Sequence, residues 1–390
     1  MNKVTDISLI DDSFVSLHVQ LHNQLRQLIH SGRWPNASRI PSENELTGHL
    51  DISRSTIRLA LQLAEIEGLI ERKAGRGTFV TYTPTKAHNS RLIAFITGGI
   101  DAENHLLMLN GAEQEARAHG YQIVFSNAKN QEEELLILES LEQNSIAGVL
   151  LWANAESTQS TPSLTNRYKQ LKAPIVLMDR KIPGFHCDFV TSDNYAGARA
   201  LMRHFINLGH QHIVFLSHDM VEVSPVMERY RAYCDSLEEA GLPSSEPWLV
   251  GQHGIEISAK YALRSSIDEN SLEIQQIKDY LLNAHPRPTA FFALNDWVAV
   301  FALQTMKQLR LNVPDDISIA GFDDIELAAH LDPPLTTVAQ DPFAIGKTAA
   351  QLLLDRIDTK RETNKLEVLS TELRIRSSTA NYSGNSKGGS

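Results

Sequence analysis

Apolar residues near the start of the chain recur every three or four positions. The pattern comprises Leu17, Leu21, Leu25, Leu28 and Ile29. This spacing places them on one face of an amphipathic helix. Gly32 follows, and glycine is favoured in the left-handed conformation that ends many helices. The sequence therefore predicts a first helix that ends before Gly32.

Two further helices and a hairpin are expected before residue 81. Ser42 and Glu45 have the spacing of a capping box, which satisfies the free amides at the start of a helix. Ser53 can cap a third helix, which runs to Gly68. Residues 69–80 then give two short strand-like segments around a glycine-containing turn. This order predicts a winged helix-turn-helix domain over residues 1–81.

Beyond residue 90 the chain alternates between short apolar runs and amphipathic helical patterns. Strands are expected at 92–97, 122–126, 148–153, 175–179, 189–191, 213–217, 290–294 and 317–322, and helical patterns include 106–119, 132–143, 196–208, 229–240 and 297–309. Such alternation is typical of parallel sheets covered on both faces, with ligands bound beyond the carboxyl ends of the strands. Because one lobe cannot hold all these elements, the sequence predicts two α/β lobes with a cleft between them.

Two segments lack any apolar period. Residues 82–90 contain a proline and are mostly small or polar, which predicts a linker between a domain at 1–81 and a bilobal domain at 91–380. Residues 381–390 are small and polar, so we expect a disordered tail.

Composition narrows the class of protein. A hydrophobic fraction of 42% and a charged fraction of 21% are those of a soluble globular protein. No window approaches the roughly 18 apolar residues of a membrane helix, and acidic residues stand where a signal peptide would be apolar. We therefore expect a cytoplasmic protein without a membrane partner. Cys187 and Cys234 lack CxxC spacing and predict neither a disulfide framework nor a zinc site.

The net charge of −11 argues against nucleic-acid binding unless charge is segregated. Basic residues do gather between positions 53 and 78, namely Arg54, Arg58, Arg72, Lys73 and Arg76. A locally basic face on an acidic protein can bind DNA. DNA binding thus remains open on charge alone.

The start of the third helix carries side chains suited to DNA. Its residues are Ser53, Arg54, Ser55, Thr56 and Arg58. A helix N-terminus in the major groove offers amides to phosphate, and arginine, serine and threonine reach phosphates or base edges. In the hairpin, Gly75 and Gly77 permit close backbone approach, with Arg76 free to enter a minor groove. The alternative for the hairpin is an ordinary turn with a solvated arginine.

These segments resemble the winged-helix DNA-binding domain of the GntR family. The resemblance is carried by Ile40-Pro41-Ser42-Glu43, Ser53-Arg54-Ser55-Thr56-Ile57-Arg58, Glu67-Gly68-Leu69-Ile70 and Gly75-Arg76-Gly77-Thr78-Phe79-Val80. It implies that Ser42 and Glu43 cap and orient, that Arg54, Thr56 and Arg58 read or grip double-stranded operator DNA, and that the wing clamps the groove. Asn44 departs from the pattern, since many members carry arginine there.

Polar side chains follow several of the predicted strands in the second domain. They are Asp179-Arg180, Asp193-Asn194, Asn295-Asp296 and Asp323-Asp324, and Arg229 begins a helix. Sugar hydroxyls both donate and accept hydrogen bonds, and carboxylates and arginine bind them strongly. For any single residue the alternative is a helix cap or a solvated loop. Their recurrence predicts a site for a polyhydroxylated ligand.

Residues 91–376 also resemble the effector domain of LacI-type repressors, which is related to periplasmic sugar-binding proteins. The matching segments include Asp193-Asn194-Tyr195-Ala196-Gly197, Glu228-Arg229, Asn295-Asp296, Val313–Asp324 and Pro333–Val338. The resemblance implies one lobe of about 91–190 with 341–362 and a second of about 191–340 with 366–376. It makes Arg229 and Asp296 the first candidates for ligand contact, then Asp179 and Asp323, then Arg180 and Asp193.

A GntR-type reader joined to a LacI-type sensor is the arrangement of the AraR group of arabinose-responsive repressors. It implies a homodimer that is released from operator DNA by a sugar, arabinose or a related one. No catalytic residue, cofactor or metal is expected. An enzyme is the main alternative, but Ile345-Gly346-Lys347-Thr348 matches only the end of a P-loop, and His204, His210, His212 and His218 lack metal-site spacing. The second alternative is a carbohydrate-binding protein without specific DNA binding.

Overall fold

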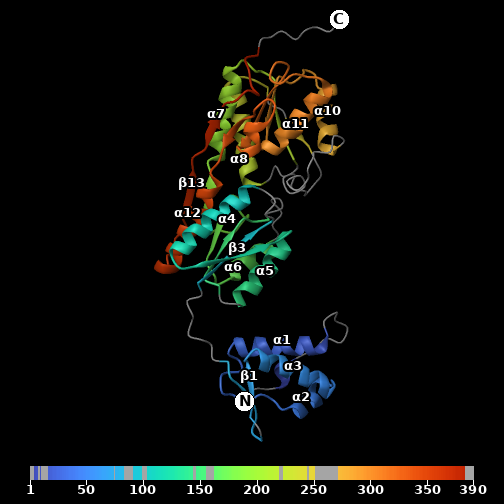
Figure 1. Cartoon of the computed structure of the whole chain (residues 1–390), viewed down its shortest axis with the longest axis vertical. Coiled ribbons are helices and arrows are strands. Elements are labelled where there is room, and N and C mark those ends of the chain that lie inside the picture. Colours follow the sequence, from blue (N-terminus) through green and yellow to red (C-terminus); the bar gives the residue numbers. More distant parts are fainter. Residues whose placement is uncertain are drawn as a thin grey trace. The chain divides into compact units, whose positions relative to one another are not determined.

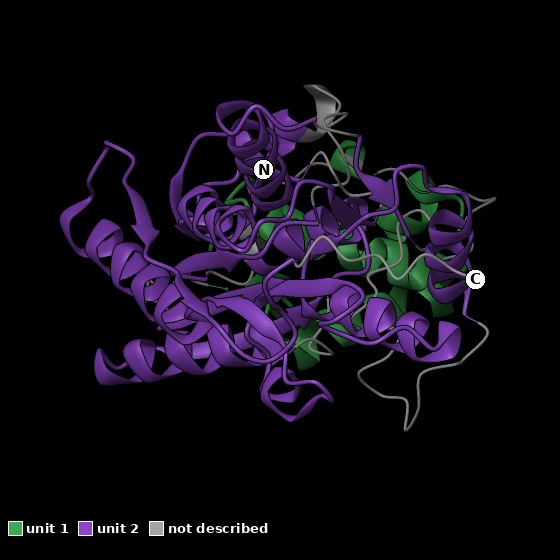
Figure 2. Cartoon of the chain, turned by 90° about the horizontal axis from the view of Figure 1, so that it is seen from above, with its two compact units in different colours: residues 1–89 green, residues 90–390 purple. Residues whose placement is uncertain are grey.

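The structure is a computed structural model in which the chain forms two compact units. It describes residues 4–7, 9, 16–73, 75–82, 91–98, 103–143, 146–154, 162–218, 223–243, 246–250 and 271–382. The units are residues 1–89 and 90–390, coloured separately in Figure 2. Residues 83–90, most of the predicted linker, lie outside the described residues. No helix in the described ranges is both long and apolar enough to span a membrane.

The first unit is a small helical core with an antiparallel hairpin. Its elements are a 3-10 turn (Val4–Asp6), α1 (Leu17–His30), α2 (Glu43–Leu50), α3 (Arg54–Ile66), β1 (Ile70–Lys73) and β2 (Gly77–Val80). The predicted apolar stripe of α1 packs on α3, with Leu21, Leu25 and Leu61 almost fully buried. Gly68 takes φ +70° after α3. The predicted winged helix-turn-helix is confirmed.

The second unit contains two six-stranded sheets among its described residues. The first has the order β13-β7-β6-β5-β3-β4, with β3 (Leu92–Thr97), β4 (Gln122–Asn127), β5 (Gly148–Leu151), β6 (Ile175–Met178), β7 (Asp188–Ser192) and β13 (Leu366–Leu369). The second has the order β14-β12-β11-β10-β8-β9, with β8 (Ile213–Ser217), β9 (Trp248–Leu249), β10 (Ala290–Ala293), β11 (Ser318–Asp323), β12 (Thr336–Ala339) and β14 (Glu372–Arg374). All neighbouring strands are parallel except β12 and β14.

Helices accompany both sheets, as Figure 1 shows. With the first sheet are α4 (Glu103–Ala118), α5 (Gln131–Gln143), α6 (Pro162–Gln170) and α12 (Pro342–Thr359); with the second are α7 (Asn194–Asn207), α8 (Ser224–Glu239), α10 (Leu272–Asn283), α11 (Asp296–Leu309) and a 3-10 turn (Glu326–His330). The central strands are buried along their length, as expected of sheets covered on both faces. The predicted two-lobed α/β architecture is confirmed.

The third passage of the chain between the lobes differs from expectation. The resemblance places residues 366–376 in the second lobe, but β13 pairs in parallel with β7 of the first sheet, and only β14 pairs with β12 of the second. The chain therefore crosses between Leu369 and Glu372. The physical reason is the backbone ladder to β7, which continues as far as Ser192 and draws in residues 366–369 before the crossing.

The predicted tail also begins later than expected. The Tyr382 amide donates to the Leu208 carbonyl at 2.8 Å, and His210 Nε2 lies 3.1 Å from the Ala380 carbonyl oxygen. Tyr382 is thus hydrogen-bonded to Leu208, the residue that follows α7, which corrects the expectation for it. The rest of the predicted tail, 383–390, lies outside the described residues.

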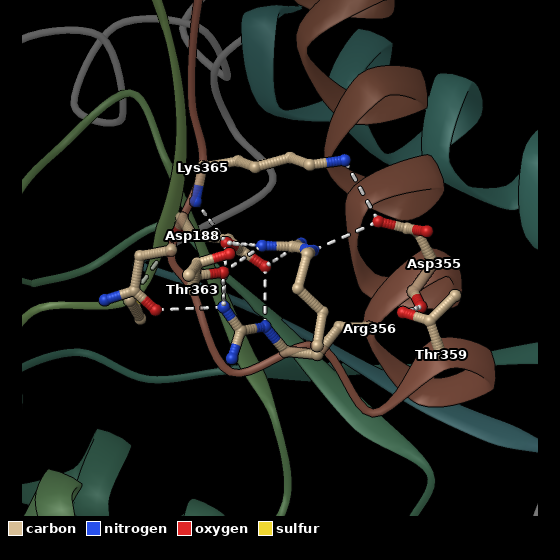
Figure 3. A network of polar contacts seen from close by, with 9 residues as sticks. Asp188, Asp355, Arg356, Thr359, Thr363 and Lys365 are labelled. Carbon is tan, nitrogen blue, oxygen red and sulfur yellow. Dashed lines mark hydrogen bonds and ion pairs between the residues drawn. The ribbon is translucent and has the colours of Figure 1, made fainter.

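A network of charges secures the end of α12 and the turn before β13 (Figure 3). Asp188, fully buried at the start of β7, accepts from Arg356 Nε and Nη2 at 2.7 and 2.9 Å and from Arg361 Nη2 at 2.9 Å. The Lys365 amide donates to the same carboxylate at 2.7 Å. Burial opposes ionisation of Asp188, but these hydrogen bonds outweigh it and lower its pKa.

Candidate functional site

The two predicted helix caps of the first unit are formed. The Ser42 amide donates to Glu45 Oε2 at 2.7 Å, and the Ser42 hydroxyl accepts from the Glu45 amide, which completes the capping box. The Ser53 hydroxyl accepts from the Thr56 amide at 3.1 Å and lies 2.8 Å from the hydroxyls of Ser55 and Thr56. These hydroxyls therefore cluster at the exposed N-terminus of α3.

Glu43 links the three parts of the predicted DNA-reading surface. Its carboxylate accepts from Arg58 Nε at 3.0 Å and lies 3.9 Å from Arg72 Nη1 of the wing. Arg58 stays 66% exposed in spite of this contact. Arg54 is also exposed at the start of α3. Glu43 thus orients Arg58 and leaves its guanidinium accessible.

The wing tip has the backbone that its glycines predicted. Gly75 and Gly77 adopt φ +70° and +105°, and Arg76 between them is exposed. A Cβ on Gly77 would lie 2.7 Å from the Arg39 side chain. Glycine is therefore needed at 77 both for conformation and for the approach of Arg39, a basic residue that the sequence reasoning did not single out.

The second unit contains a cleft lined by residues of both lobes. Among its described lining residues, the first lobe supplies Glu103, His105, Trp152, Asp179 and Arg180, and the second supplies His218, Arg229, Asn295, Trp297 and Asp323. Gln340, between β12 and α12, lines the cleft where the chain passes from one lobe to the other. Asp179, Arg180, Arg229 and Asp323, four of the predicted ligand residues, are thus brought together.

Arg229 is a buried cation of the second lobe. It is 5% exposed, donates from Nε to Asn194 Oδ1 and from Nη1 to the Leu294 carbonyl, both at 2.8 Å, and lies over the Phe322 ring at 3.7 Å. Its Nη2 is 3.6 Å from Asp323 Oδ1. Burial lowers the pKa of Arg229, which the nearby carboxylates oppose. Its guanidinium is therefore fixed in position beside the Asp323 carboxylate.

Two aspartates of the cleft have unusual backbone conformations. Asp179 follows β6 with φ +62°, and Asp323 ends β11 with φ +116°. Positive φ costs energy for a residue with a side chain and is concentrated at functional sites. Burial raises the pKa of Asp323 to about 6, although Arg229 and Gln340 oppose the shift. The fold thus holds both carboxylates in the cleft against an energetic cost.

Aromatic and histidine side chains complete the cleft. The Arg180 guanidinium lies 3.5 Å from the centre of the Trp152 ring, and His105 meets the same ring at 4.3 Å. Burial, reinforced by Arg180 and Arg229, lowers the pKa of His218 to about 4. His218 is therefore neutral at pH 7. No sequence pattern singled out Trp152, because a tryptophan after a buried strand also reads as core.

Asp296, predicted as a first candidate for ligand contact, is not among the residues that line the described cleft. It is fully buried, and its two oxygens accept from Thr337 Oγ1 at 2.6 Å and the Ile325 amide at 3.0 Å. The preceding residue, Asn295, lines the cleft and caps α11 through the Val298 amide. At the start of a helix, neighbouring side chains point in different directions, and here Asn295 rather than Asp296 lines the cleft.

Asp193 is likewise absent from the described cleft lining. Its side chain accepts from the Ala196 amide at 2.8 Å and caps α7. The Asp193 amide also donates to the Leu369 carbonyl at 2.7 Å, which links the residue after β7 to the end of β13. The helix cap that the sequence offered as the alternative is formed, and ligand contact by Asp193 stays a prediction.

Features that pointed toward an enzyme have structural roles. A Cβ on Gly346, from the P-loop-like segment, would lie 1.8 Å from the Met108 carbonyl oxygen, so this glycine allows α12 to lie against α4 (Figure 1). His204 and His210 contact Thr379 and Thr289. Within the described ranges, no three histidine, cysteine or carboxylate side chains are grouped to hold a metal ion.

Both units match known families. Residues 17–80 match the bacterial regulatory proteins of the gntR family, and residues 202–379 match the periplasmic binding protein-like domain. A solved complex of the transcriptional regulator CelR with cellobiose has a TM-score of 0.62 at 22% identity and covers 85% of this chain and 93% of that one. A LacI family regulator from Enterococcus faecium with bound ribose has a TM-score of 0.60 at 24% identity and covers 75% and 99%.

Proteins with similar sequences carry the names of transcriptional regulators. The arabinose metabolism transcriptional repressor of Geobacillus stearothermophilus is 28% identical over 372 residues, 93% of this chain and 97% of the relative. The transcriptional repressor PurR of Aliivibrio fischeri is 30% identical over 275 residues, 70% of this chain and 77% of the relative. The chain therefore belongs to the bacterial transcriptional regulators that join a gntR-family winged-helix DNA-binding domain to a periplasmic binding protein-like domain.

Proposed function

We propose that this protein is a repressor that binds operator DNA as a homodimer and is released by a sugar, arabinose or a related one. The observation that carries the proposal is the pairing of buried Arg229 with Asp323 in a cleft between two lobes, in a chain that also carries a winged helix. Buried carboxylates and arginine are the groups that bind sugar hydroxyls strongly. The names of its relatives, an arabinose repressor among them, agree with this.

In the proposed DNA complex, α3 enters the major groove. Arg54 and Arg58 contact bases or phosphates, the hydroxyls of Ser53, Ser55 and Thr56 bind phosphate, and Gly75, Arg76 and Gly77 approach the minor groove. Ser42 and Glu43 hold this surface in shape through the capping box and the Arg58 contact. A dimer would place two such surfaces about 34 Å apart, or a multiple of that, along the duplex.

In the proposed sensing step, a sugar between the lobes favours their closed arrangement. Two contacts already join the lobes near the cleft: the Lys181 amide donates to Ser224 Oγ at 3.1 Å, and the Glu326 amide donates to Glu103 Oε2 at 3.2 Å. A ligand that binds one lobe arrangement better shifts the population toward it. Sugar and DNA then oppose each other by one coupling free energy, typically about 1 to 3 kcal/mol.

Operator release tests the proposal directly. Duplexes selected by the full-length protein from a random pool are titrated by fluorescence anisotropy with and without L-arabinose, D-ribose, D-xylose and cellobiose. We expect a selected sequence with two half-sites and a loss of affinity of about 5- to 150-fold with one sugar. Failure to enrich any sequence, or affinity that no sugar changes, would overturn the proposal. Sedimentation equilibrium tests the dimer independently.

A further inference from the structure

The wing hairpin is widened by the extended segment that precedes α2. Backbone hydrogen bonds of 2.8 to 3.0 Å join residues 37–40 to residues 78–80 of β2. Arg39 lies opposite Phe79 in this antiparallel pairing. The pairing therefore makes the Arg39 side chain part of the wing.

The widened wing has two faces, because side chains alternate along a strand. The inner face is turned to the helices: Ile40, Ile70 and Val80 are almost fully buried, and Arg72 lies 3.4 Å from Glu65 of α3. The register puts every second residue on the opposite face, together with the backbone of Gly77. We call that opposite face the outer wing face; its side chains are Arg39, Glu71, Lys73 and Phe79.

Arg39 is the uncompensated cation of the outer wing face. It is exposed and forms no hydrogen bond or ion pair with a described residue. The pKa of Glu45 is lowered mainly by its hydrogen bonds with Ser42, and the charge of Arg39 adds to this only after them. Arg39 Nε lies 2.7 Å from the place that a Cβ on Gly77 would take, so the guanidinium lies directly on the wing backbone. A cation held in this way is available to an anionic partner.

Lys73 is the second cation of this face and already has an acidic neighbour. Its Nζ lies 3.4 Å from Glu71 Oε2 and 5.7 Å from the centre of the Phe79 ring. Both charged side chains are about half exposed, at 49% and 55%. Exposed pairs of this kind contribute only about 0 to 1 kcal/mol, so a phosphate can replace Glu71 as the partner of Lys73 at little cost.

The wing lies between the outer wing face and α3. In the proposed DNA complex α3 occupies the major groove and the wing tip, with Arg76, approaches the next minor groove. The duplex then continues past the wing on the side away from α3, which is the side of Arg39. Contacts to phosphate in this position add affinity that does not depend on base sequence.

We propose that the outer wing face binds phosphates of the DNA that flanks each half-site, with Arg39 as the main contact and Lys73 as the second. The inference rests on the proposed function and adds a DNA contact separate from the surface of α3. It also gives Gly77 a role in DNA binding, because a side chain there would displace the Arg39 guanidinium. DNA is favoured over an acidic protein because this face continues directly into the wing tip, since Lys73 and Gly77 are paired residues at the end of the hairpin.

Duplexes of two lengths test where the contact lies. A duplex selected by the full-length protein is either trimmed at the outer ends of its half-sites or extended there by about ten base pairs, one helical turn, of A·T-rich or G·C-rich sequence. Fluorescence anisotropy over a series of salt concentrations gives the affinity and its salt dependence. We expect both extended duplexes to bind more tightly, with a slope of log affinity against log salt that is steeper by about 0.9 for each added phosphate contact. Equal affinities and slopes for the two lengths overturn this inference, whereas failure to select any duplex overturns the proposed function itself.

Arg39→Gln tests the residue, with Arg33→Gln as its matched control. Arg33 belongs to the same unit, is 65% exposed and pairs with Asp6, so its substitution removes the same charge away from the wing. We expect Arg39→Gln to weaken the extended duplexes about tenfold and to reduce the salt slope by about 0.9 for each protomer, while the trimmed duplex changes by less than about twofold. Arg33→Gln should resemble the wild type on every duplex.

Arg39→Lys separates a contact to phosphate from a purely structural role of the arginine. Lysine keeps the positive charge that phosphate requires but loses the planar guanidinium that lies on Gly77. We expect it to retain most of the affinity for the extended duplexes and the full salt slope. If Arg39→Gln has no effect, or weakens trimmed and extended duplexes equally, at the melting temperature of the wild type, Arg39 does not bind flanking DNA.

Discussion

Thr337 on β12 donates its hydroxyl proton to Asp296 Oδ1 at 2.6 Å, at the start of α11. The other Asp296 oxygen accepts from the Ile325 amide, and the missing side chain of Gly321 leaves room for the carboxyl group. Burial and nearby Asp323 raise the pKa of Asp296 well above its usual value. Asp296 thus joins α11 to β12 and to the segment after β11.

Substitution of Asp296 should therefore change the stability of the fold more than its affinity for a ligand. Asp296→Ala leaves two buried donors unpaired and should lower the free energy of unfolding by about 2 to 4 kcal/mol. Asp296→Asn keeps the acceptor for one of them and should cost less, with sugar affinity within about twofold of the wild type. Urea unfolding and calorimetry measure the two quantities. Lost binding in Asp296→Asn at unchanged stability would restore Asp296 as a direct ligand contact.

Some of these features were within reach of the sequence, and others depend on contacts that no local pattern encodes. Caps at Ser42 and Ser53 follow from local chemistry, since the capped amides lie three residues away. Buried parallel strands can be recognised in the sequence as short apolar runs. By contrast, the exposed pattern of β13 carries no sign that it will pair with β7, some 180 residues earlier, and no spacing rule indicates that Gln340 will lie against Asp323. These placements result from tertiary packing.

Arg58 should matter more for DNA than an arginine elsewhere on the same unit. Arg58→Ala removes a proposed base or phosphate contact and should weaken binding to a selected duplex by about 10- to 100-fold. Arg33→Ala is the matched control, because Arg33 is similarly exposed at 65% and pairs with Asp6 at 2.7 Å. Fluorescence anisotropy at fixed salt gives both affinities. Equal losses in the two variants would show a general charge effect rather than a contact of α3.

The Asp188 network makes a stability prediction with a definite dependence on pH. Arg356→Met removes two of the hydrogen bonds to a fully buried carboxylate and should destabilise the fold by about 3 kcal/mol near pH 7. The pKa of Asp188 is lowered in the folded state. The ionised carboxylate therefore contributes fully to the free energy of unfolding when pH is above its ordinary pKa of 3.8, and this contribution is lost as pH falls further.

The difference in the free energy of unfolding between the wild type and Arg356→Met should therefore become smaller below about pH 4. Denaturant unfolding at a series of pH values measures it. Arg374→Met serves as the control, since Arg374 and Glu372 form an exposed pair on β14, and such pairs contribute little. If the difference in unfolding free energy did not change with pH, Arg356 would stabilise the fold by packing rather than by its charge.

The pKa of Glu134 is shifted upward, opposite to that of Asp188, because its buried carboxyl group has no cation hydrogen-bonded to it in the described structure. It accepts from the Tyr168 hydroxyl at 2.6 Å and from the Asn154 amide at 2.8 Å, and burial raises its pKa to about 7 against these hydrogen bonds. The folded state then holds a proton that the unfolded chain releases above about pH 4.5. Its contribution to the free energy of unfolding should fall by about 3 kcal/mol as pH rises from 4.5 to 7.

Glu134→Gln should abolish this slope, since glutamine does not titrate and can still accept from Asn154 while donating to Tyr168. Tyr168→Phe should extend the slope to higher pH, because it removes a hydrogen bond that favours the carboxylate. Unfolding curves of the three proteins between pH 4.5 and 8 distinguish these outcomes. Parallel pH profiles for wild type and Glu134→Gln would assign the slope to another group, because only titration of Glu134 separates the two proteins.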